Sequence, residues 1–335
     1  MRLSVGPSVH RVFGVIALRS ADVLHLLPAG ETVALVESAA LAAGGDDDCV
    51  VPERQHIHWG ANTLLTMPAI GAGALGVKLV SVVPGNAARG LAVTNGLVIL
   101  GDAQTGLPLA IMNAESLTAI RTGAVGALGI KHLTPADVTS VGVVGPGVQG
   151  AWQAIFACAV RPISEVFVLG RSAASIERFV AALAAYAPAV TVVPCSSVTE
   201  LLARTDVIIT ATTSSEPVLP DESALLAGKH FIGIGSYKPG MQELPNSVFR
   251  LSGHVVLDSK FARHEVGEAV RPVQQGILAE QDVFTIGELV AGRRTIDITH
   301  TTAYKSAGMA LYDLFVAKAL YEAARRQNLG QEVAL

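Results

Sequence analysis

The segment VTSVGVVGPGVQG, residues 138–150, decides the fold of this chain. Its first part, Val138–Val144, is an apolar run rich in β-branched residues and predicts a buried strand. The second part fits the pattern G-x-G-x-x-G and leads into a helical pattern. Glycines allow a tight turn there, and a helix N-terminus can direct free N–H groups at a pyrophosphate. The segment therefore predicts a dinucleotide site, with contacts from Gly145, Gly147, Val148, Gln149 and Gly150.

Downstream of this segment the chain alternates between strand and helix patterns. Such alternation is typical of a parallel, doubly wound sheet with helices on both faces. The expected strands are 165–169, 190–193, 207–211, 230–235 and 254–257, and the expected helices begin near Gly147 or cover 173–187 and 198–203. We therefore expect a Rossmann-type dinucleotide-binding domain over residues 126–302.

The N-terminal part of the chain has a different pattern. Residues 50–110 form short β-rich segments separated by Gly, Pro and Asn, with a hairpin expected around Asp102–Gly106. The other expected elements are a strand at Val12–Leu18, a helix at Pro28–Ala43, a solvated turn at Asp46–Asp48 and a helix at Leu117–Leu133.

A final helix, expected at Ser306–Arg326, is apolar on more than one face and should pack back on the N-terminal part. The fold class is thus α/β, with the doubly wound sheet inserted into an α+β domain made of residues 1–125 and 303–335.

Composition excludes several classes of protein. Half of the 335 residues are hydrophobic, 16% are charged and the formal net charge is −4. These values exclude disorder and leave no basic face for a nucleic acid. The charge-free spans Gln55–Val77 and Val138–Val160 are long enough to cross a bilayer, but glycines and prolines interrupt both. No membrane span is predicted.

Neither a leader sequence nor a metal site is expected. The apolar run Val12–Leu18 is short and lacks a small-residue cleavage site, so we expect the protein in the cytoplasm. His56 and His58 alternate on a predicted strand, but no third ligand accompanies them at a recognisable spacing. The three cysteines, Cys49, Cys158 and Cys195, are widely separated and have no metal-type spacing.

The end of the second expected strand bears on the choice of cofactor. NAD enzymes usually carry an acidic residue there, which accepts hydrogen bonds from the adenosine ribose. Here Leu169 is followed by Gly170, Arg171 and Ser172, and an arginine with a hydroxyl suits a 2′-phosphate. We therefore favour NADPH and keep NADH open. Thr210 and Thr212, at the end of a later strand, are further candidates to line the cofactor.

Short segments along nearly the whole chain carry a resemblance to a known family. They are residues 51–54 (VPER), 76–78 (GVK), 84–86 (PGN), 105–110 (TGLPLA), 117–123 (LTAIRTG), the glycine loop, Pro239 with Glu243-Leu244, and 304–308 (YKSAG) with Asp313. Together they make the chain similar to the ornithine cyclodeaminase/μ-crystallin family. That family includes cyclodeaminases, alanine dehydrogenases, ketimine reductases and μ-crystallin-type binding proteins. The resemblance implies that the first domain binds a small-molecule substrate and forms a homodimer.

The resemblance also implies site residues. Arg54, Lys78 and Arg121 match three cationic positions that hold a substrate carboxylate. Three cations that converge on one cleft repel each other unless an anion neutralises them. On the cofactor side, the matching positions are Thr122 for the phosphates, Val93 or Thr94 near the nicotinamide, and Gly235, Ser236 and Tyr237.

Two departures from the family pattern concern proton transfer. Cyclodeaminases and archaeal-type alanine dehydrogenases of the family carry aspartates where this chain has Tyr237 and Lys305. Cyclodeamination takes a proton from an ammonium group and expels ammonia, which calls for carboxylates. Reduction of a cyclic ketimine needs less, because the imine can be protonated in solution. Tyr237, Lys305 or a water molecule stays open as the proton donor.

The sequence therefore favours NAD(P)H-dependent reduction of a cyclic ketimine carboxylate. Δ1-pyrroline-2-carboxylate would yield L-proline, and Δ1-piperideine-2-carboxylate would yield L-pipecolate. Ornithine or lysine cyclodeamination with internally recycled NAD is the first alternative, and a μ-crystallin-like binding protein is another. The intact cations Arg54, Lys78 and Arg121 argue against pure binding.

Overall fold

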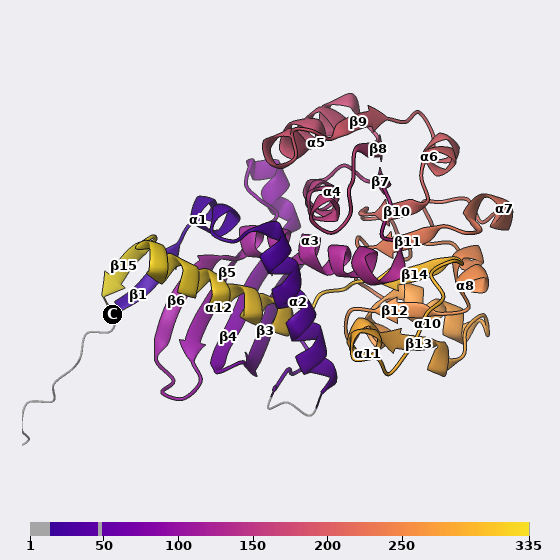
Figure 1. Ribbon diagram of the computed structural model, residues 1–335. Coiled ribbons are helices and arrows are strands. Elements are labelled where there is room, and N and C mark those ends of the chain that lie inside the picture. Colours follow the sequence, from indigo (N-terminus) through magenta and orange to yellow (C-terminus); the bar gives the residue numbers. More distant parts are fainter. Residues whose placement is uncertain (1–13, 46–48, 335) are drawn as a thin grey trace, which may run out of the picture.

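The computed structural model describes residues 14–45 and 49–334. The expected turn Asp46–Asp48 and the first two residues of the expected strand Val12–Leu18 lie outside the described residues. Two β-sheets lie at opposite ends of the molecule, and the long helix α3 (Ala114–Leu133) runs between them (Figure 1). Helix α3 contacts strands of both sheets, so it joins the two halves of the molecule.

The first sheet has seven strands in the order β15-β1-β6-β5-β4-β3-β2. Its neighbouring strands are antiparallel except for β1 and β6, which are parallel. The predicted hairpin around Asp102–Gly106 joins β5 and β6. The strands are β1 (Gly14–Leu18), β2 (Gln55–Trp59), β3 (Asn62–Gly71), β4 (Ala74–Val82), β5 (Thr94–Asp102), β6 (Pro108–Asn113) and β15 (Gln331–Ala334).

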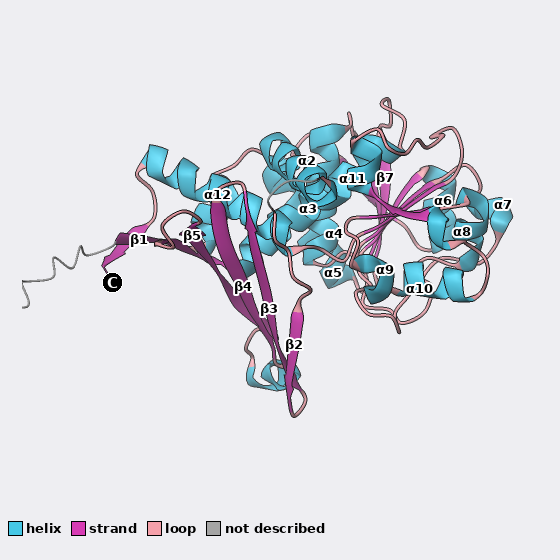
Figure 2. Cartoon of the chain, turned by 90° about the horizontal axis from the view of Figure 1, so that it is seen from below, coloured by secondary structure: helices cyan, strands magenta, loops and turns pink. Residues whose placement is uncertain are grey.

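Helix α12 (Ala310–Gln327) packs across β3, β4 and β5 on one face of this sheet (Figure 2). The expectation that the final helix returns to the N-terminal part is thereby confirmed. Paired residues such as Met67, Lys78 and Val98 share this covered face and are buried. Helices α1 (Ser20–His25) and α2 (Ala29–Gly44) complete this part of the molecule.

The second sheet has eight strands in the order β13-β12-β14-β11-β10-β7-β8-β9, and all its pairs are parallel. The predicted doubly wound parallel sheet is therefore confirmed. Its strands are β7 (Ser140–Val144), β8 (Glu165–Leu169), β9 (Thr191–Pro194), β10 (Val207–Thr210), β11 (His230–Gly233), β12 (Val255–Leu257), β13 (Val283–Thr285) and β14 (Thr302–Lys305).

The order of the strands reverses between β7 and β10, which are neighbours in the sheet although β8 and β9 lie between them in the chain. Ligands of such sheets bind outside the carboxyl ends of the strands at this switch point.

The remaining helices are α4 (Val148–Val160), α5 (Ala173–Tyr186), α6 (Val198–Arg204), α7 (Ser223–Leu226), α8 (Asn246–Ser252), α9 (Ala262–Glu265), α10 (Gly267–Gln274) and α11 (Ile286–Val290), with short 3₁₀ turns at Pro84–Arg89 and Glu280–Asp282.

The predicted start of the last helix at Ser306 is wrong. Residues 302–305 form β14, which lies between β11 and β12, and the helix begins only at Ala310. Gly308 has a φ of +78°, a left-handed conformation that interrupts any helix running back toward β14. The expected domain boundary at 302/303 therefore lies inside β14, and the boundary at 125/126 lies inside α3.

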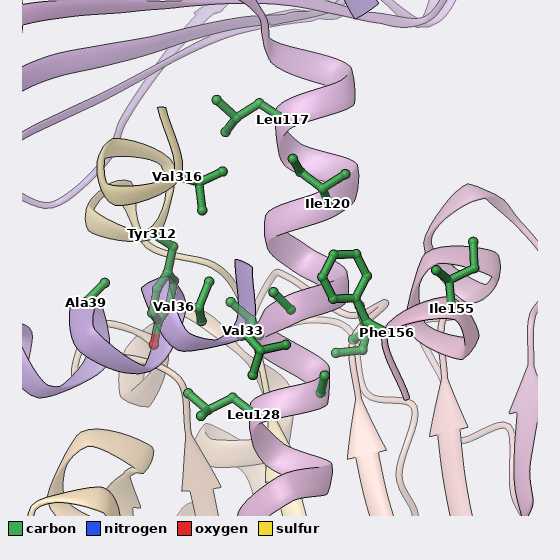
Figure 3. Close-up of a cluster of buried hydrophobic side chains, with 14 of the residues drawn as sticks. Val33, Val36, Ala39, Leu117, Ile120, Leu128, Ile155, Phe156, Tyr312 and Val316 are labelled. Atoms are coloured by element: carbon green, nitrogen blue, oxygen red, sulfur yellow. The ribbon is translucent and has the colours of Figure 1, made fainter. Parts of the chain in front are cut away.

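The two halves share one hydrophobic core centred on α3 (Figure 3). Leu117, Ile120 and Leu128 of α3 pack with side chains from α2, α4 and α12. Gly123 lets α4 approach closely, because an added Cβ would lie 2.9 Å from the carbonyl oxygen of Trp152. This core holds Arg121 and Thr122 rigidly between the two sheets. None of the helices in residues 14–45 and 49–334 is both long and apolar enough to cross a membrane.

Candidate active site

The glycine loop closes tightly at the end of β7. Gly145 has a φ of +103°, and an added Cβ would lie 2.6 Å from the carbonyl oxygen of Ala211, after β10. Gly147 caps α4, which begins at Val148. The close approaches at Gly145 exclude a side chain there, and Gly147 leaves the backbone at the start of α4 open to a ligand.

A cleft of about 1070 Å³ opens beside the loop. Six of the predicted cofactor residues line it, namely Gly145, Gly147, Val148, Arg171, Ser172 and Thr212. Gln149 and Gly150 lie in the first turn of α4, and Thr210 is completely buried in β10. The volume, the glycine turn and the helix N-terminus at one place fit a dinucleotide.

The far end of this cleft is basic. Arg171 and Ser172 follow β8, and Arg178 of α5 lines the same cleft. Ser172 also caps α5 by accepting a hydrogen bond from the Ser175 amide at 3.3 Å. The sequence interpretation missed Arg178. It lies seven residues beyond Arg171, about two helical turns, and only the helix places both beside one cavity.

Two buried glutamates hold the loops that follow β10 and β11. The Glu243 carboxylate accepts hydrogen bonds from the amides of Thr212 (2.6 Å) and Gly235 (2.6 Å) and from the Ser236 amide. Glu268 accepts hydrogen bonds from the Ser236 hydroxyl and from the Glu243 amide. Both glutamates are fully buried. They position the predicted cofactor residues Thr212, Gly235 and Ser236, a role for which no sequence signal was recognised.

The predicted cations Lys78 and Arg121 meet on one carboxylate, that of Asp313. The Lys78 ammonium donates to Asp313 at 2.7 Å, and Arg121 Nε donates to its other oxygen at 3.0 Å. All three side chains are buried. Burial lowers the pKa of Lys78 to about 8, although Asp313 opposes that shift. Burial also disfavours the charge of Asp313, but the two cations hold the pKa of this carboxyl below its usual range.

Arg54 reaches the same place from the segment before β2. Its guanidinium donates to the carbonyl oxygens of Ala307 (3.3 Å) and Gly308 (2.5 Å), in the loop between β14 and α12. It also lies 3.1 Å from a carboxylate oxygen of Glu265, the last residue of α9. Three of the predicted site residues, Arg54, Lys78 and Arg121, are therefore held by partners in the structure.

The loop Ser306–Met309 connects the two cationic groups. The Asp258 carboxylate, after β12, accepts hydrogen bonds from the Ser306 hydroxyl (2.7 Å) and from the amide of Gly308 (2.6 Å). Gly308 lies between Arg54, which donates to its carbonyl, and Arg121, whose guanidinium would collide with an added Cβ. Arg54 and Arg121 are therefore separated by a single residue of this loop.

The cationic site keeps hydrogen-bond donors for a ligand. Ion pairs join Arg54 to Glu265 and join both Lys78 and Arg121 to Asp313, and a third buried carboxylate, that of Asp258, lies against the same loop. Among the described residues no hydrogen bond is made by the Nη atoms of Arg121. A guanidinium with two such donors can hold a carboxylate through two parallel hydrogen bonds. The cationic site thus suits one small monoanion.

The other predicted residues lie apart from the cationic site. Tyr237 is 50% exposed, with the Lys238 ammonium 5.3 Å above its ring. Lys305 is completely buried, its side chain passes Gly233, and its ammonium has no hydrogen-bond partner among the described residues. Neither side chain makes a hydrogen bond or an ion pair with Asp313 or the three cations within the described part of the chain.

The remaining cofactor candidates are distributed over both halves. Val93 and Thr94 are exposed at the start of β5. Thr122 is buried, and its hydroxyl has no hydrogen-bond partner within residues 14–45 and 49–334. A buried hydroxyl without a partner is costly, so Thr122 fits a ligand contact. His56 and His58 are exposed on β2, and the described residues contain no cluster of three metal-ligating side chains.

The fold and the site together define an α/β protein with a Rossmann-type dinucleotide cleft and a buried cationic site for a small anion. The chain belongs to the ornithine cyclodeaminase/mu-crystallin family, whose model matches residues 42–328. The resemblance predicted from the short segments is thereby confirmed.

Two relatives have names that specify a reaction. A Δ1-pyrroline-2-carboxylate reductase of Bacillus cereus is 35% identical over 283 residues, which cover 81% of this chain and 85% of the relative. A Δ1-pyrroline-2-carboxylate/Δ1-piperideine-2-carboxylate reductase of Azospirillum brasilense is 32% identical over 316 residues, which cover 92% of this chain and 98% of the relative.

Two solved structures share the fold over nearly the whole chain. The Δ1-pyrroline-2-carboxylate reductase of Thermococcus litoralis, in complex with NADH and L-proline, has a TM-score of 0.87 and 29% identity and covers 95% of this chain and 100% of its own. An archaeal alanine dehydrogenase dimer with bound NAD has a TM-score of 0.86 and 29% identity and covers 96% of this chain and 99% of its own.

Proposed function

We propose that this protein reduces a cyclic ketimine carboxylate with NAD(P)H. The substrates are Δ1-pyrroline-2-carboxylate, which yields L-proline, and Δ1-piperideine-2-carboxylate, which yields L-pipecolate. The observation that carries the proposal is the cationic site, in which the Nη atoms of Arg121 make no hydrogen bond to the described residues, at the same carboxyl edge of the sheet as the glycine loop. The reductases of Bacillus cereus and Azospirillum brasilense support the choice of reaction.

Orientation of the substrate is the main task of the cationic site. Arg121 holds the substrate carboxylate through its two Nη atoms, while Lys78 and Arg54 add charge on either side. Because the reacting carbon bears this carboxylate, fixing the carboxylate fixes the carbon as well. The cofactor, when bound, supplies hydride to that carbon. Gly145, Gly147 and Val148 hold its pyrophosphate, and Thr122 is a further candidate for a phosphate contact.

NADPH is the preferred cofactor in this proposal, and NADH is the second choice. Arg171, Ser172 and Arg178 line one end of the cleft and offer two guanidinium groups to a 2′-phosphate. No acidic residue follows β8 to accept from a ribose hydroxyl, since Leu169 leads to Gly170-Arg171-Ser172.

A homodimer is part of the proposal. The face of the seven-stranded sheet opposite α12 carries exposed apolar side chains, including Ile57, Trp59, Ile70 and Leu97. Several large apolar side chains exposed on one sheet face fit an interface, and an isologous pairing of two copies would cover them. Sedimentation equilibrium should give twice the mass of the chain.

The cytoplasm is the proposed location, and three cysteines without a common spacing fit a reducing compartment.

Cyclodeamination of ornithine or lysine is the alternative. Its need for carboxylates at the substrate amine is not met at Tyr237 or Lys305, which replace the two aspartates of the cyclodeaminases. A μ-crystallin-like binding protein is the other alternative, and it would bind the cofactor without turnover.

The test follows the absorbance of the reduced nicotinamide with NADPH and NADH against each of the two imines. We expect rapid oxidation of NADPH, and the Arg121→Ala variant should raise the substrate KM and lower kcat. No oxidation with either imine, together with release of ammonia from ornithine or lysine, would favour the cyclodeaminase. Unchanged kinetics in Arg121→Ala would contradict the assignment of the carboxylate anchor.

A further inference from the structure

The carboxyl group of Glu265 lies against the cationic site, and neither the sequence analysis nor the proposed reaction assigns it a role. Glu265 ends α9, which follows β12 at the carboxyl edge of the eight-stranded sheet. One of its oxygens lies 3.1 Å from Arg54 Nη2, and both side chains are about five-sixths buried. The same guanidinium donates to Gly308, whose backbone packs on Arg121.

The surroundings of Glu265 are largely apolar. A narrow pocket beside it is lined by Pro52, Met67, Phe261 and Met309, together with Arg54. The oxygen that faces Arg54, Oε2, is shielded from water and has no partner besides that guanidinium among the described residues. The charged groups that act on it are Arg54, Asp258 and Glu53. Burial raises the pKa of Glu265, the nearby charges of Asp258 and Glu53 add to this shift, and Arg54 opposes it.

Substrate binding favours the protonated form of Glu265 further. A substrate carboxylate on Arg54 and Arg121 brings a negative charge next to Glu265 and neutralises the cation that stabilises its ionised form. Both effects favour protonation of the Glu265 carboxyl. The pKa of Glu265 should therefore rise further when the substrate binds, which favours the protonated acid. In a cyclic ketimine carboxylate the nitrogen and the carboxylate are attached to the same carbon, so the nitrogen lies close to the groups that surround the carboxylate, among them Arg54 and the Glu265 carboxyl in contact with it.

We propose that Glu265 is the acid that protonates the ring nitrogen, an inference that rests on the proposed reductase function. As hydride from NAD(P)H forms the new C–H bond, the electron pair of the C=N bond moves to the nitrogen. That pair takes the proton from the Glu265 carboxyl, so an O–H bond breaks and an N–H bond forms. The resulting carboxylate is stabilised by Arg54 and is protonated again from solvent.

The other candidate donors are less well placed. Tyr237 is half exposed, and the Lys305 ammonium makes no hydrogen bond or ion pair with Arg54, Lys78, Arg121 or Asp313 in the described part of the chain. Asp313 is held between two cations that keep it ionised, so it has no proton to give.

The first experiment needs no turnover. Cyclopentanecarboxylate, which has the ring and the carboxylate but no nitrogen, is titrated into the cofactor-loaded protein by calorimetry at neutral pH in buffers of different ionisation enthalpy. We expect binding to take up a fraction of a proton in the wild type and none in Glu265→Gln. The matched control Glu322→Gln, which removes a solvent-exposed carboxylate of α12 that is not among the charges acting on Glu265, should retain the uptake.

The second experiment measures turnover of the imine. For Glu265→Gln we expect kcat to fall about 100-fold at neutral pH, a typical loss for a missing general acid, with little change in KM. The loss of kcat in Glu265→Gln should be smaller at pH 5, where water already protonates the imine, and Glu265→Asp should restore part of the rate.

Proton uptake and kcat like those of the wild type in Glu265→Gln would overturn the proposal. A raised KM with unchanged kcat would also overturn it, because it would assign Glu265 to the support of Arg54. A wild type inactive on both imines would overturn the proposed function together with it.

Discussion

In the dinucleotide cleft the decisive groups are backbone atoms, whereas in the cationic site they are charged side chains. Gly145, Gly147 and the start of α4 come from one short segment, and their conformation follows from local sequence. Arg54, Lys78, Arg121 and Asp313 come from four distant segments and meet only because α3 and α12 share a core. The cleft should therefore tolerate loss of single side chains, and the cationic site should not.

The largest effect is expected from removal of the shared carboxylate. Asp313→Asn leaves the buried charges of Lys78 and Arg121 without a counter-ion, and such a change typically destabilises a protein by about 3–5 kcal/mol. Urea unfolding measures this loss. Glu322→Gln on the same helix is the control, because its pair with Lys318 is solvent-exposed and should contribute at most about 0.5 kcal/mol. Equal losses of unfolding free energy in the two variants would contradict a buried ion-pair network of Asp313 with Lys78 and Arg121.

A second, smaller effect is expected at the residue between the two arginines. Gly308→Ala places a Cβ against the Arg121 guanidinium in addition to straining a φ of +78°. Gly228→Ala is matched, since φ is +75° there and nothing lies within 4 Å of an added Cβ. Both variants should lose about 1 kcal/mol of stability from the backbone alone. Only Gly308→Ala should also raise the substrate KM, by about tenfold, which corresponds to about 1.4 kcal/mol. A KM change of similar size in Gly228→Ala would contradict the role of the loop Ser306–Met309 in positioning Arg121.

The smallest effect is expected in the cleft. Arg171→Ala and Arg178→Ala should each raise the KM for NADPH about fivefold or less, since both side chains are exposed and an exposed ion pair contributes roughly 0.2–1 kcal/mol. The KM for NADH should stay unchanged, because NADH has no 2′-phosphate. Equal changes with both cofactors would show that the arginines act on something other than the phosphate.

The sequence predicted the cleft better than the cationic site. A strand, a glycine loop and a helix are local features, so Val138–Gly150 contained enough information to place them. The cations Arg54, Lys78 and Arg121 were found through a family resemblance, because no local pattern brings such distant residues together. The wrong start of the last helix has a similar cause. The helical pattern continues back to Ser306, but pairing of residues 302–305 within a sheet and the left-handed Gly308 end it.

The roles of several residues could not be predicted from the sequence because they depend on contacts across the fold. Glu265 contacts Arg54, Asp258 holds the loop Ser306–Gly308, and Glu268 supports Glu243, a residue that the sequence offered only as part of a family segment. The sequence alone does not distinguish a buried carboxylate from an exposed one. Only burial and hydrogen-bond partners distinguish them.

By itself, the sequence determined the α/β class, the glycine loop and its dinucleotide, since these depend on hydrophobic periodicity and on the backbone freedom of glycine within one segment. The tertiary structure alone decided how the charges are balanced. Asp313 pairs with Lys78 and Arg121, Glu265 pairs with Arg54, and Arg178 lines the same cleft as Arg171. Charges interact through space, over distances that the order of residues along a chain does not specify.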